Sequence, residues 1–373
     1  MQKVLTFAPV LIAALGLSIG SQAASLVGWG SGFSTNYPPA LTNVVAIAAG
    51  SGHGLALITN GSVVAWGDNS YSQTNVPASV SNVVAVAAGY YHSLALKSDG
   101  TVAAWGRNTY TQTIVPAGLS NVVAIAGGEN HSLALKADGT AINWGQYSDG
   151  TPNFFTNALP PTMTNMVAIA AGNNHDLMLR GDGTVVTWGQ NMFGQTNVPP
   201  GTTNVIAIAA GGDDNLVLTA DGRLIAWGRN DFFQTNVPAG LTNVAAISAG
   251  QDHNLALRGQ GTVAAWGSNL TGQTNVPAAI SNVVAMAAGK DGSLALTGLG
   301  PALLSLTHPL RNQSVFSVSA ATVRGRSYRL EFKSALTDQN WTMLPPVPGD
   351  GTTKTLTNAA PTSPKRFYRV RQW

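Results

Sequence analysis

A Trp-Gly pair recurs seven times along this chain of 373 residues, and its spacing limits the folds that the sequence can adopt. The intervals between successive pairs are 37, 39, 39, 44, 39 and 39 residues. Two other markers run in phase with the pair: an Ala-rich segment that ends in Gly, and a Leu-x-Leu segment. Three markers in phase indicate structural repeats, each too small to bury its own hydrophobic face alone. The pairs begin at Trp29, Trp66, Trp105, Trp144, Trp188, Trp227 and Trp266.

Each repeat divides into segments of strand length. Residues 121–126 form a short apolar run that ends at Gly127-Gly128, as a buried strand does. Residues 131–136 alternate in polarity and lead to Asp138-Gly139. An Asp-Gly pair between two such runs predicts a two-residue hairpin turn with positive φ at both residues. The return segment carries the Trp, so each repeat is predicted to be an antiparallel sheet of three strands, with a fourth left open.

The two ends of the array complement each other. The first repeat begins at the Trp29 segment, and no Leu-x-Leu segment precedes it. The last repeat reaches Leu296, but Ser305 stands where its Trp should follow. Residues 25–30 can supply the missing strand and remove the open edges that a solenoid would have to cap. The sequence therefore predicts an all-β fold, a seven-bladed β-propeller closed by an N-terminal strand.

The repeat motif resembles that of a known family. The pattern Gly-x-x-His-Ser-Leu-Ala-Leu-Lys-x-Asp-Gly-Thr-Val-x-x-Trp-Gly-x-Asn, followed by Gly-Gln, stands at Gly89–Asn108, Gly128–Gly145 and Gly172–Asn191. It closely resembles the repeat of the regulator of chromosome condensation family, over about residues 25–298. That resemblance also implies a seven-bladed propeller. The short repeats are more similar to those of bacterial members, which include a secreted propeller that inhibits β-lactamases.

The N-terminus predicts where the protein acts. Residues 1–23 read as a secretory signal peptide, with Lys3, an apolar stretch over residues 4–20 and a small-residue cleavage site at Ser21-Gln22-Ala23. We therefore expect a protein that is secreted or associated with the periplasm or cell surface, which argues against the chromatin and nucleotide-exchange role of the eukaryotic family members. No later stretch has the ~18 apolar residues of a membrane span.

Composition changes after the repeats. The expected domains are the propeller over residues 24–298, a linker over 299–302 and an all-β module over 303–373. Residues 301–373 hold 10 Lys and Arg against 3 Asp and Glu, a net charge of +7, whereas residues 1–300 carry a net charge of −4. Alternating segments predict that this small basic module is sandwich-like.

The basic module interleaves Arg with aromatic residues in two segments. One interpretation is an anion-binding face for an acidic polysaccharide or the phosphates of lipopolysaccharide. The alternatives are a solvated strand face whose Arg stems cover apolar surface, or docking onto the acidic propeller. The candidate residues are Arg324, Arg326, Arg329, Lys365, Arg366 and Arg369.

Five His residues occupy one repeat position, three residues after the Gly of the Ala-rich segment. Imidazole is a common metal ligand, but neighbouring blades are too far apart for one ion to be shared. We expect each His to hydrogen-bond to the backbone of a neighbouring blade, a role that the family repeat also suggests, and the Trp side chains to pack between blades. These residues are His53, His92, His131, His175 and His253, and Asp214 and Gly292 replace them in two repeats.

The sequence offers no pattern for catalysis. The absence of Cys excludes disulfides, thiolate metal sites and thiol nucleophiles. We find no Ser nucleophile elbow, phosphate-binding loop or metalloprotease motif. Asp213-Asp214 is an adjacent carboxylate pair, but neighbours on a strand point to opposite faces. We therefore predict no catalytic residues, no metal site and no cofactor.

Aromatic residues recur in the loops that follow the Trp segments, so repetition places them on a single rim. Aromatic rims bind sugars by stacking and proteins through hot spots. The alternative is that these rings pack within their own blades. The longer loop at residues 146–156 adds three more candidates. The rim candidates are Tyr71, Tyr110, Tyr147, Phe154, Phe155, Phe193, Phe232 and Phe233.

Together these patterns predict a secreted, non-enzymatic and monomeric binding or scaffold protein that recognises a protein or a glycan, not nucleic acid, through one propeller rim. One alternative is a secreted protein inhibitor of an enzyme, similar to the β-lactamase inhibitor. Another is a polysaccharide-active propeller enzyme, which would need clustered carboxylates in the channel or on the rim.

Overall fold

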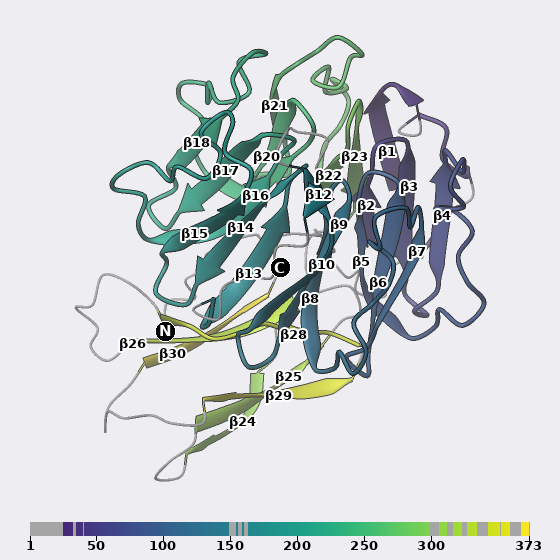
Figure 1. The fold of residues 1–373 in the computed structure, drawn as a ribbon. Helices are drawn as coiled ribbons and strands as arrows, with labels where there is room; N and C mark the ends of the chain where they lie inside the picture. Colours follow the sequence, from purple (N-terminus) through teal and green to yellow (C-terminus); the bar gives the residue numbers. More distant parts are fainter. Residues whose placement is uncertain are drawn as a thin grey trace.

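A computed structural model describes residues 25–32, 35–39, 41–148, 154–155, 159, 163–298, 306–311, 316–322, 327–333, 342–350, 352–358 and 367–372. Over these ranges the regular elements are all β-strands (Figure 1). No α-helix with the length and hydropathy of a membrane span is found among them. The predicted signal peptide lies outside the described residues.

Seven three-stranded antiparallel sheets form the blades of a propeller (Figure 1). The inner strands, which line the central channel, are β2 (Val44–Ala49), β5 (Val83–Ala88), β8 (Val122–Gly127), β13 (Met166–Ala171), β16 (Val205–Ala210), β19 (Val244–Ala249) and β22 (Val283–Ala288). The middle strands are β3 (His53–Ile58), β6 (His92–Lys97), β9 (His131–Lys136), β14 (His175–Arg180), β17 (Asp214–Thr219), β20 (His253–Arg258) and β23 (Gly292–Thr297). The outer strands, which carry the Trp, are β4 (Val63–Gly67), β7 (Val102–Gly106), β10 (Ala141–Gly145), β15 (Val185–Gly189), β18 (Leu224–Gly228), β21 (Val263–Gly267) and β1 (Ser25–Gly30). In the described residues no blade has the fourth strand that the sequence left open.

The N-terminal strand closes the ring, as predicted. β1 pairs antiparallel with β23, so that Trp29 lies opposite Ser293 and completes the seventh blade. The indole Nε1 of Trp29 donates to the backbone oxygen of Gln273, 2.8 Å away. Strands from the two ends of the propeller sequence thus share one sheet, and the closed ring leaves no blade incomplete.

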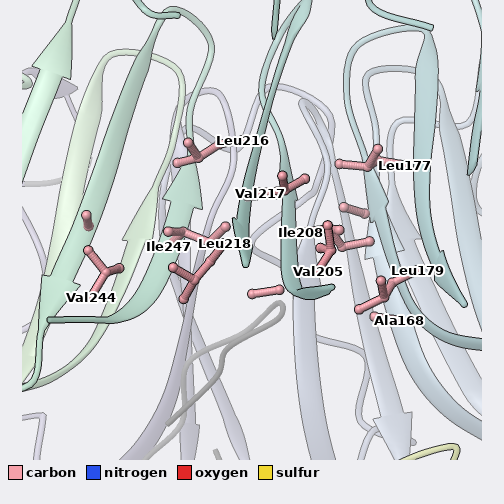
Figure 2. Close-up of a cluster of buried hydrophobic side chains, with 14 of the residues drawn as sticks. Ala168, Leu177, Leu179, Val205, Ile208, Leu216, Val217, Leu218, Val244 and Ile247 are labelled. Carbon is pink, nitrogen blue, oxygen red and sulfur yellow. The ribbon is translucent and has the colours of Figure 1, made fainter. Parts of the chain in front are cut away.

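Apolar side chains fill the space between blades, because the inner and middle strands are covered on both faces. Leu177 and Leu179 of β14 and Ile208 of β16 are at most 1% exposed and belong to one cluster. Figure 2 shows these side chains and Leu216 of β17 directed into the gaps between adjacent blades. The continuous apolar runs seen in the sequence therefore correspond to strands buried on both faces.

The hairpin turns differ from the prediction. In the second blade Gly100 has a φ of 79°, but Asp99 does not have a positive φ. The Gly100 N–H donates to the oxygen of Lys97, and the Lys97 N–H donates to Thr101, which makes a three-residue loop. The Asp99 carboxylate accepts hydrogen bonds from the backbone N–H and the hydroxyl of Thr101. A two-residue turn with two positive φ values was therefore wrong, because the Asp side chain supports a turn in which only Gly is left-handed.

The C-terminal residues form two further sheets, which confirms the predicted sandwich-like module. One sheet contains β24 (Leu306–Arg311), β25 (Phe316–Ala321) and β29 (Thr353–Asn358). The other contains β26 (Ser327–Lys333), β27 (Thr342–Met343), β28 (Val347–Pro348) and β30 (Phe367–Gln372). Val318 and Leu356 of the first sheet pack against Tyr328 and Leu330 of the second.

The module contacts the fourth blade of the propeller. The Met343 N–H donates to the oxygen of Gly181, 2.9 Å away, and the Met343 side chain is buried in the same cluster as Val167. The Arg329 guanidinium donates through Nη2 to the Val167 oxygen, also at 2.9 Å. At Met343 and Arg329 the basic module therefore docks onto the propeller, which was the third alternative for this module.

Candidate binding face at the channel mouth

Two sets of loops meet on one face of the propeller. The mouth loops join each inner strand to its middle strand, and the rim loops follow each outer strand. The Arg107 N–H donates to the Tyr91 oxygen, and the Arg229 N–H donates to the Asp213 oxygen, so each rim loop begins beside its own mouth loop. The aromatic rim and the channel opening therefore share a surface, which we call the mouth face. Its mouth loops are residues 50–52, 89–91, 128–130, 172–174, 211–213, 250–252 and 289–291, and its described rim loops include 68–76, 107–115, 190–198, 229–237 and 268–276.

Buried polar side chains hold the rim loops in shape. Gln73 is fully buried, and its Oε1 accepts a hydrogen bond from the Tyr71 N–H at 2.8 Å. The Asn69 Oδ1 accepts another from the Thr74 N–H at 3.0 Å. Ser72, between them, has a φ of 62°. The same Gln contact recurs at Tyr110, Phe193 and Phe232, so one loop geometry presents an aromatic residue in four blades.

Large exposed hydrophobic side chains gather on these loops. Tyr71 is 44% exposed, Phe193 42% and Phe233 67%, whereas Tyr110 and Phe232 are partly buried. Among the described residues, every exposed large hydrophobic side chain lies in a rim loop. Besides the three aromatic residues, these side chains are Ile114, Met192 and Leu270. Part of the rim is therefore open for contact, while Tyr110 and Phe232 combine packing with partial exposure.

Two arginines each lie over an aromatic ring in the rim loop of the preceding blade. The guanidinium carbon of Arg107 lies 5.2 Å from the Tyr71 ring centre, 5.5 Å from that of Tyr91 and 5.0 Å from that of Tyr110. Arg229, at the same repeat position, lies 5.1 Å from the Phe193 ring centre. Cation–π contacts of this length fix the guanidinium over the rings. The sequence prediction found the aromatic residues but missed both arginines, which follow the Trp-Gly pair directly.

The long loop of the predicted rim is only partly described. Its backbone forms a short antiparallel pair, β11 (Tyr147–Ser148) with β12 (Phe154–Phe155), in which Tyr147 lies opposite Phe155. The side chains of Tyr147, Phe154 and Phe155 lie outside the described atoms. These three candidates stay predictions.

Carboxylates surround the channel opening. Burial raises the pKa of Glu129, which lines the channel, and also raises the pKa of Asp213 and Asp252 in the neighbouring mouth loops. The charges of Asp252 and Glu129 add to the raised pKa of Asp213, and those of Asp291 and Asp231 add to that of Asp252, while Arg229 lowers both pKa values. The sequence prediction noted Asp213 only beside Asp214. The sequence pattern that could have revealed these carboxylates is their repeat position, one or two residues after the Gly that ends the Ala-rich segment. Repetition places such side chains around the opening.

The His residues join adjacent blades. The Nε2 atoms of His53 and His92 lie 3.0 and 2.9 Å from the hydroxyls of Ser93 and Ser132, each on the next blade. His131 pairs in the same way with Asp176 at 2.9 Å. The predicted inter-blade role is confirmed, but the hydrogen bonds run to side chains where backbone partners were predicted. No group of three or more metal-ligating side chains is found in the described part of the chain.

The Trp side chains also join blades, as predicted. The indole Nε1 of Trp105 donates to the backbone oxygen of Gln73, and that of Trp144 to the oxygen of Gln112, each in the preceding rim loop. Both indoles are less than 10% exposed. They stabilise the base of the rim loops and are not part of the exposed surface.

One residue of the predicted anion-binding face, Arg329, is buried against the propeller. Arg329 is only 4% exposed and faces the propeller, where it bonds to Val167, so it does not belong to a solvent-exposed face. That assignment was wrong because alternation along β26 (Ser327–Lys333) could not reveal which side the fourth blade covers. Arg369 lies in β30 opposite Glu331, but its side chain is not described. Arg324, Arg326, Lys365 and Arg366 lie outside the described residues.

Comparison with known proteins identifies the repeats. The family model for the regulator of chromosome condensation (RCC1) repeat matches residues 44–73, 83–112, 166–195, 205–234 and 244–273. The chain is an RCC1-repeat propeller. Each match runs from an inner strand to the buried Gln of a rim loop, so the RCC1 repeat includes the elements that build the mouth face. No curated protein sequence gives a significant match.

Solved structures support the fold of this RCC1-repeat propeller. The chain is similar to Prp20p from Saccharomyces cerevisiae, with 21% identity, coverage of 77% of this chain and 94% of that chain, and a TM-score of 0.63. It is also similar to human WBSCR16, with 20% identity, 76% and 100% coverage, and a TM-score of 0.58. The CRINKLY WD40 ectodomain of the Arabidopsis thaliana receptor kinase ACR4 shares 19% identity over 71% of this chain and 91% of its own, with a TM-score of 0.51.

Proposed function

We propose that this RCC1-repeat propeller is a secreted, non-enzymatic scaffold that binds a protein partner through the mouth face. The observation that carries the proposal is the gathering of exposed hydrophobic side chains on the rim loops. In the described part of the chain these side chains all lie on the rim loops of one face, and a concentration of exposed apolar side chains on one face favours an interaction site.

The composition of the rim favours a protein partner. Interface hot spots are enriched in Tyr and Arg, and Arg107 with Tyr71 and Tyr110 supplies both types in a fixed arrangement. A side chain already fixed before binding loses little conformational entropy on association. Prp20p, which shares the fold, is described in its structure report by its binding to Gsp1p and histones. Propellers of this fold thus include a protein-binding member.

The proposed location rests on the N-terminal sequence. Lys3, the apolar stretch over residues 4–20 and the small-residue cleavage site have the arrangement of a signal peptide. N-terminal sequencing of the protein recovered from culture medium or periplasm should begin at Ala24. A chain that stays inside the cell with Met1 in place would contradict secretion without touching the binding proposal.

The binding proposal is tested with two matched baits. One carries Tyr71→Ala, Phe193→Ala and Phe233→Ala, and the other carries Ser98→Ala and Gln260→Ala, exposed positions on the opposite edge of the blades. Both should unfold at the same temperature as the parent chain. We expect a purified partner, identified by cross-linking to the rim, to lose affinity for the first bait only. Equal affinity for both baits would contradict the proposal.

A further inference from the structure

We propose that the channel mouth binds an organic cation, an ammonium or guanidinium group on an aliphatic stem. This site is separate from the hydrophobic rim proposed above, and it would take the cationic group of a small amine or of a basic side chain. The inference rests on a cavity, on buried polar atoms with unmet hydrogen-bonding capacity and on an excess of negative charge.

The cavity is the central channel itself. Its volume is about 370 Å³, and its walls are built mainly from Ala, Gly and larger apolar residues of the seven inner strands. This volume lies within the range of small-molecule sites. Polar side chains line both ends of the cavity. At the end opposite the mouth they include Arg258, Gln260 and Asn282. At the mouth they come from the second residue of a mouth loop; they are Tyr90, Glu129, Asn173, Gln251 and Lys290. A ligand entering from the mouth therefore meets polar groups before it meets an apolar wall.

Two polar atoms at this mouth are buried with unmet hydrogen-bonding capacity. Among the described residues, the Gln251 Oε1 has no hydrogen-bond partner, and the Tyr90 hydroxyl has only the Asn173 side chain beside it. An amide oxygen can only accept a hydrogen bond, and a phenol oxygen can accept as well as donate. A buried polar atom without a partner is unfavourable. A ligand that brings N–H donors would satisfy both atoms.

The charges around the opening favour a cation. Five carboxylates and three positive groups act on one another around the opening. The positive groups are Arg107, Arg229 and Lys290. The carboxylates are Glu129, Asp213, Asp231, Asp252 and Asp291. The opening therefore carries a formal excess of two negative charges. Glu129, Asp213 and Asp252 are partly buried and act electrostatically on the Tyr90 hydroxyl. Partial burial strengthens their attraction for a cation, because the effective dielectric constant falls.

The positive side chains already present offset these carboxylates only in part. Arg107 lies over three tyrosine rings. Arg229 pairs most closely with Asp231, with Nε 2.6 Å from Oδ2, and its Nη1 lies 3.8 Å from Asp213 Oδ2. Lys290 Nζ lies 5.9 Å from the Tyr90 ring centre, and no ion pair joins it to a carboxylate in the described part of the chain. Lys290 thus shows where a cation sits against Tyr90 without neutralising the carboxylates directly.

The experiment uses the mature chain and small probes. Butylammonium and butylguanidinium are titrated by NMR, with butanol and butyrate as uncharged and anionic probes of the same stem. We expect saturable binding of the two cations only. A peptide with one lysine side chain is then compared with its norleucine counterpart. Binding of the lysine peptide identifies a basic side chain as the ligand, whereas binding of the free amine alone identifies a small amine; either result supports the cation site.

Variants separate this site from general effects. Glu129→Gln and Asp252→Asn should each weaken cation binding about tenfold, and Asp138→Asn, an exposed carboxylate on the opposite edge, should leave it unchanged. Lys290→Gln should strengthen binding, an effect that misfolding cannot produce. Equal binding of butanol, or the same affinity in Glu129→Gln and Asp252→Asn as in the parent chain, would overturn the proposal. The probes do not need the rim, so this outcome is independent of partner binding.

Discussion

The guanidinium carbon of Arg107 lies 5.2 Å from the ring centre of Tyr71, which belongs to the preceding blade. Tyr71 is held by the buried Gln73, and Arg107 begins the next rim loop beside the Tyr91 oxygen. A single cation–π contact therefore connects the rim loops of two blades. The mouth face is a surface whose exposed residues are fixed in place across blade boundaries, which suits it to binding without large rearrangement.

A double-mutant cycle measures this connection. Arg107→Ala and Tyr71→Ala should show a coupling of about 0.5–1 kcal/mol in the free energy of unfolding, the range for exposed cation–π pairs. Tyr71→Phe keeps the ring and should retain most of the coupling. Urea unfolding of the four chains gives the value. Strict additivity of the two Ala substitutions would show that the rings and the guanidinium are merely adjacent.

The His53–Ser93 hydrogen bond should stabilise the boundary between the first two blades. Ser93→Ala removes the hydroxyl that bonds to His53 Nε2 and also donates to the Gln73 oxygen. Both groups are fully buried, so the loss should lower the free energy of unfolding by about 1–3 kcal/mol. Ser98→Ala, at an exposed position of the same blade, should change it little. If thermal unfolding shows both variants equally stable, the hydrogen bond does not stabilise the boundary.

The sequence predicted the propeller well, because the repeat fixes which residues are buried in every blade at once. Trp29 has no Leu-x-Leu segment before it, and Ser305 stands where the last Trp should be; these two facts were enough to predict closure by β1. It predicted the site less well, because the site depends on neighbours from different repeats. Arg107 stacks on Tyr71 across 36 positions, and Arg329 reaches Val167 across 162, and no local pattern encodes either contact.

Arg329 should help to hold the C-terminal module on the propeller. Arg329→Leu keeps an apolar stem but removes the hydrogen bond to the Val167 oxygen. Because a buried carbonyl then loses its donor, hydrogen exchange at Met343 and around Val167 should become faster while the other blades stay protected. Lys354→Ala, which breaks an ion pair with Asp350 within the module, serves as the control. Unchanged exchange in Arg329→Leu would mean that Met343 alone holds the module.

Acid should destabilise the propeller through its buried imidazoles. Burial lowers the pKa of His53, His175 and His253 to about 4 and that of His92 to about 3, from 6.5. Between those values the unfolded chain binds protons that the folded chain does not, so stability is fully present above about pH 6.5 and falls as the pH drops toward 4. Urea unfolding across this window should show the decline. His53→Gln should reduce its slope by about one proton, and an unchanged slope would contradict the assignment.

Asp214 occupies the His position of the fifth blade and should act in the opposite direction. Its pKa is raised from 3.8 to about 8, chiefly by burial; the hydrogen bond from Asn254 acts against this shift, and the charges of Asp252 and Asp213 contribute to it. The folded chain therefore holds a proton that the unfolded chain releases, so this contribution to stability falls as the pH rises toward 8.

The effect of Asp214 should be visible where the histidines no longer titrate. Between about pH 6.5 and 8 the free energy of unfolding should fall by roughly 1.4 kcal/mol per pH unit. Asp214→Asn has the same shape without the titration, and it should flatten this part of the curve in urea unfolding. Asp138→Asn provides the matched control, because the pKa of Asp138 is lowered to about 2 and lies far below this window. A parent curve that is already flat above pH 6.5 would show that Asp214 is ionised in the folded blade.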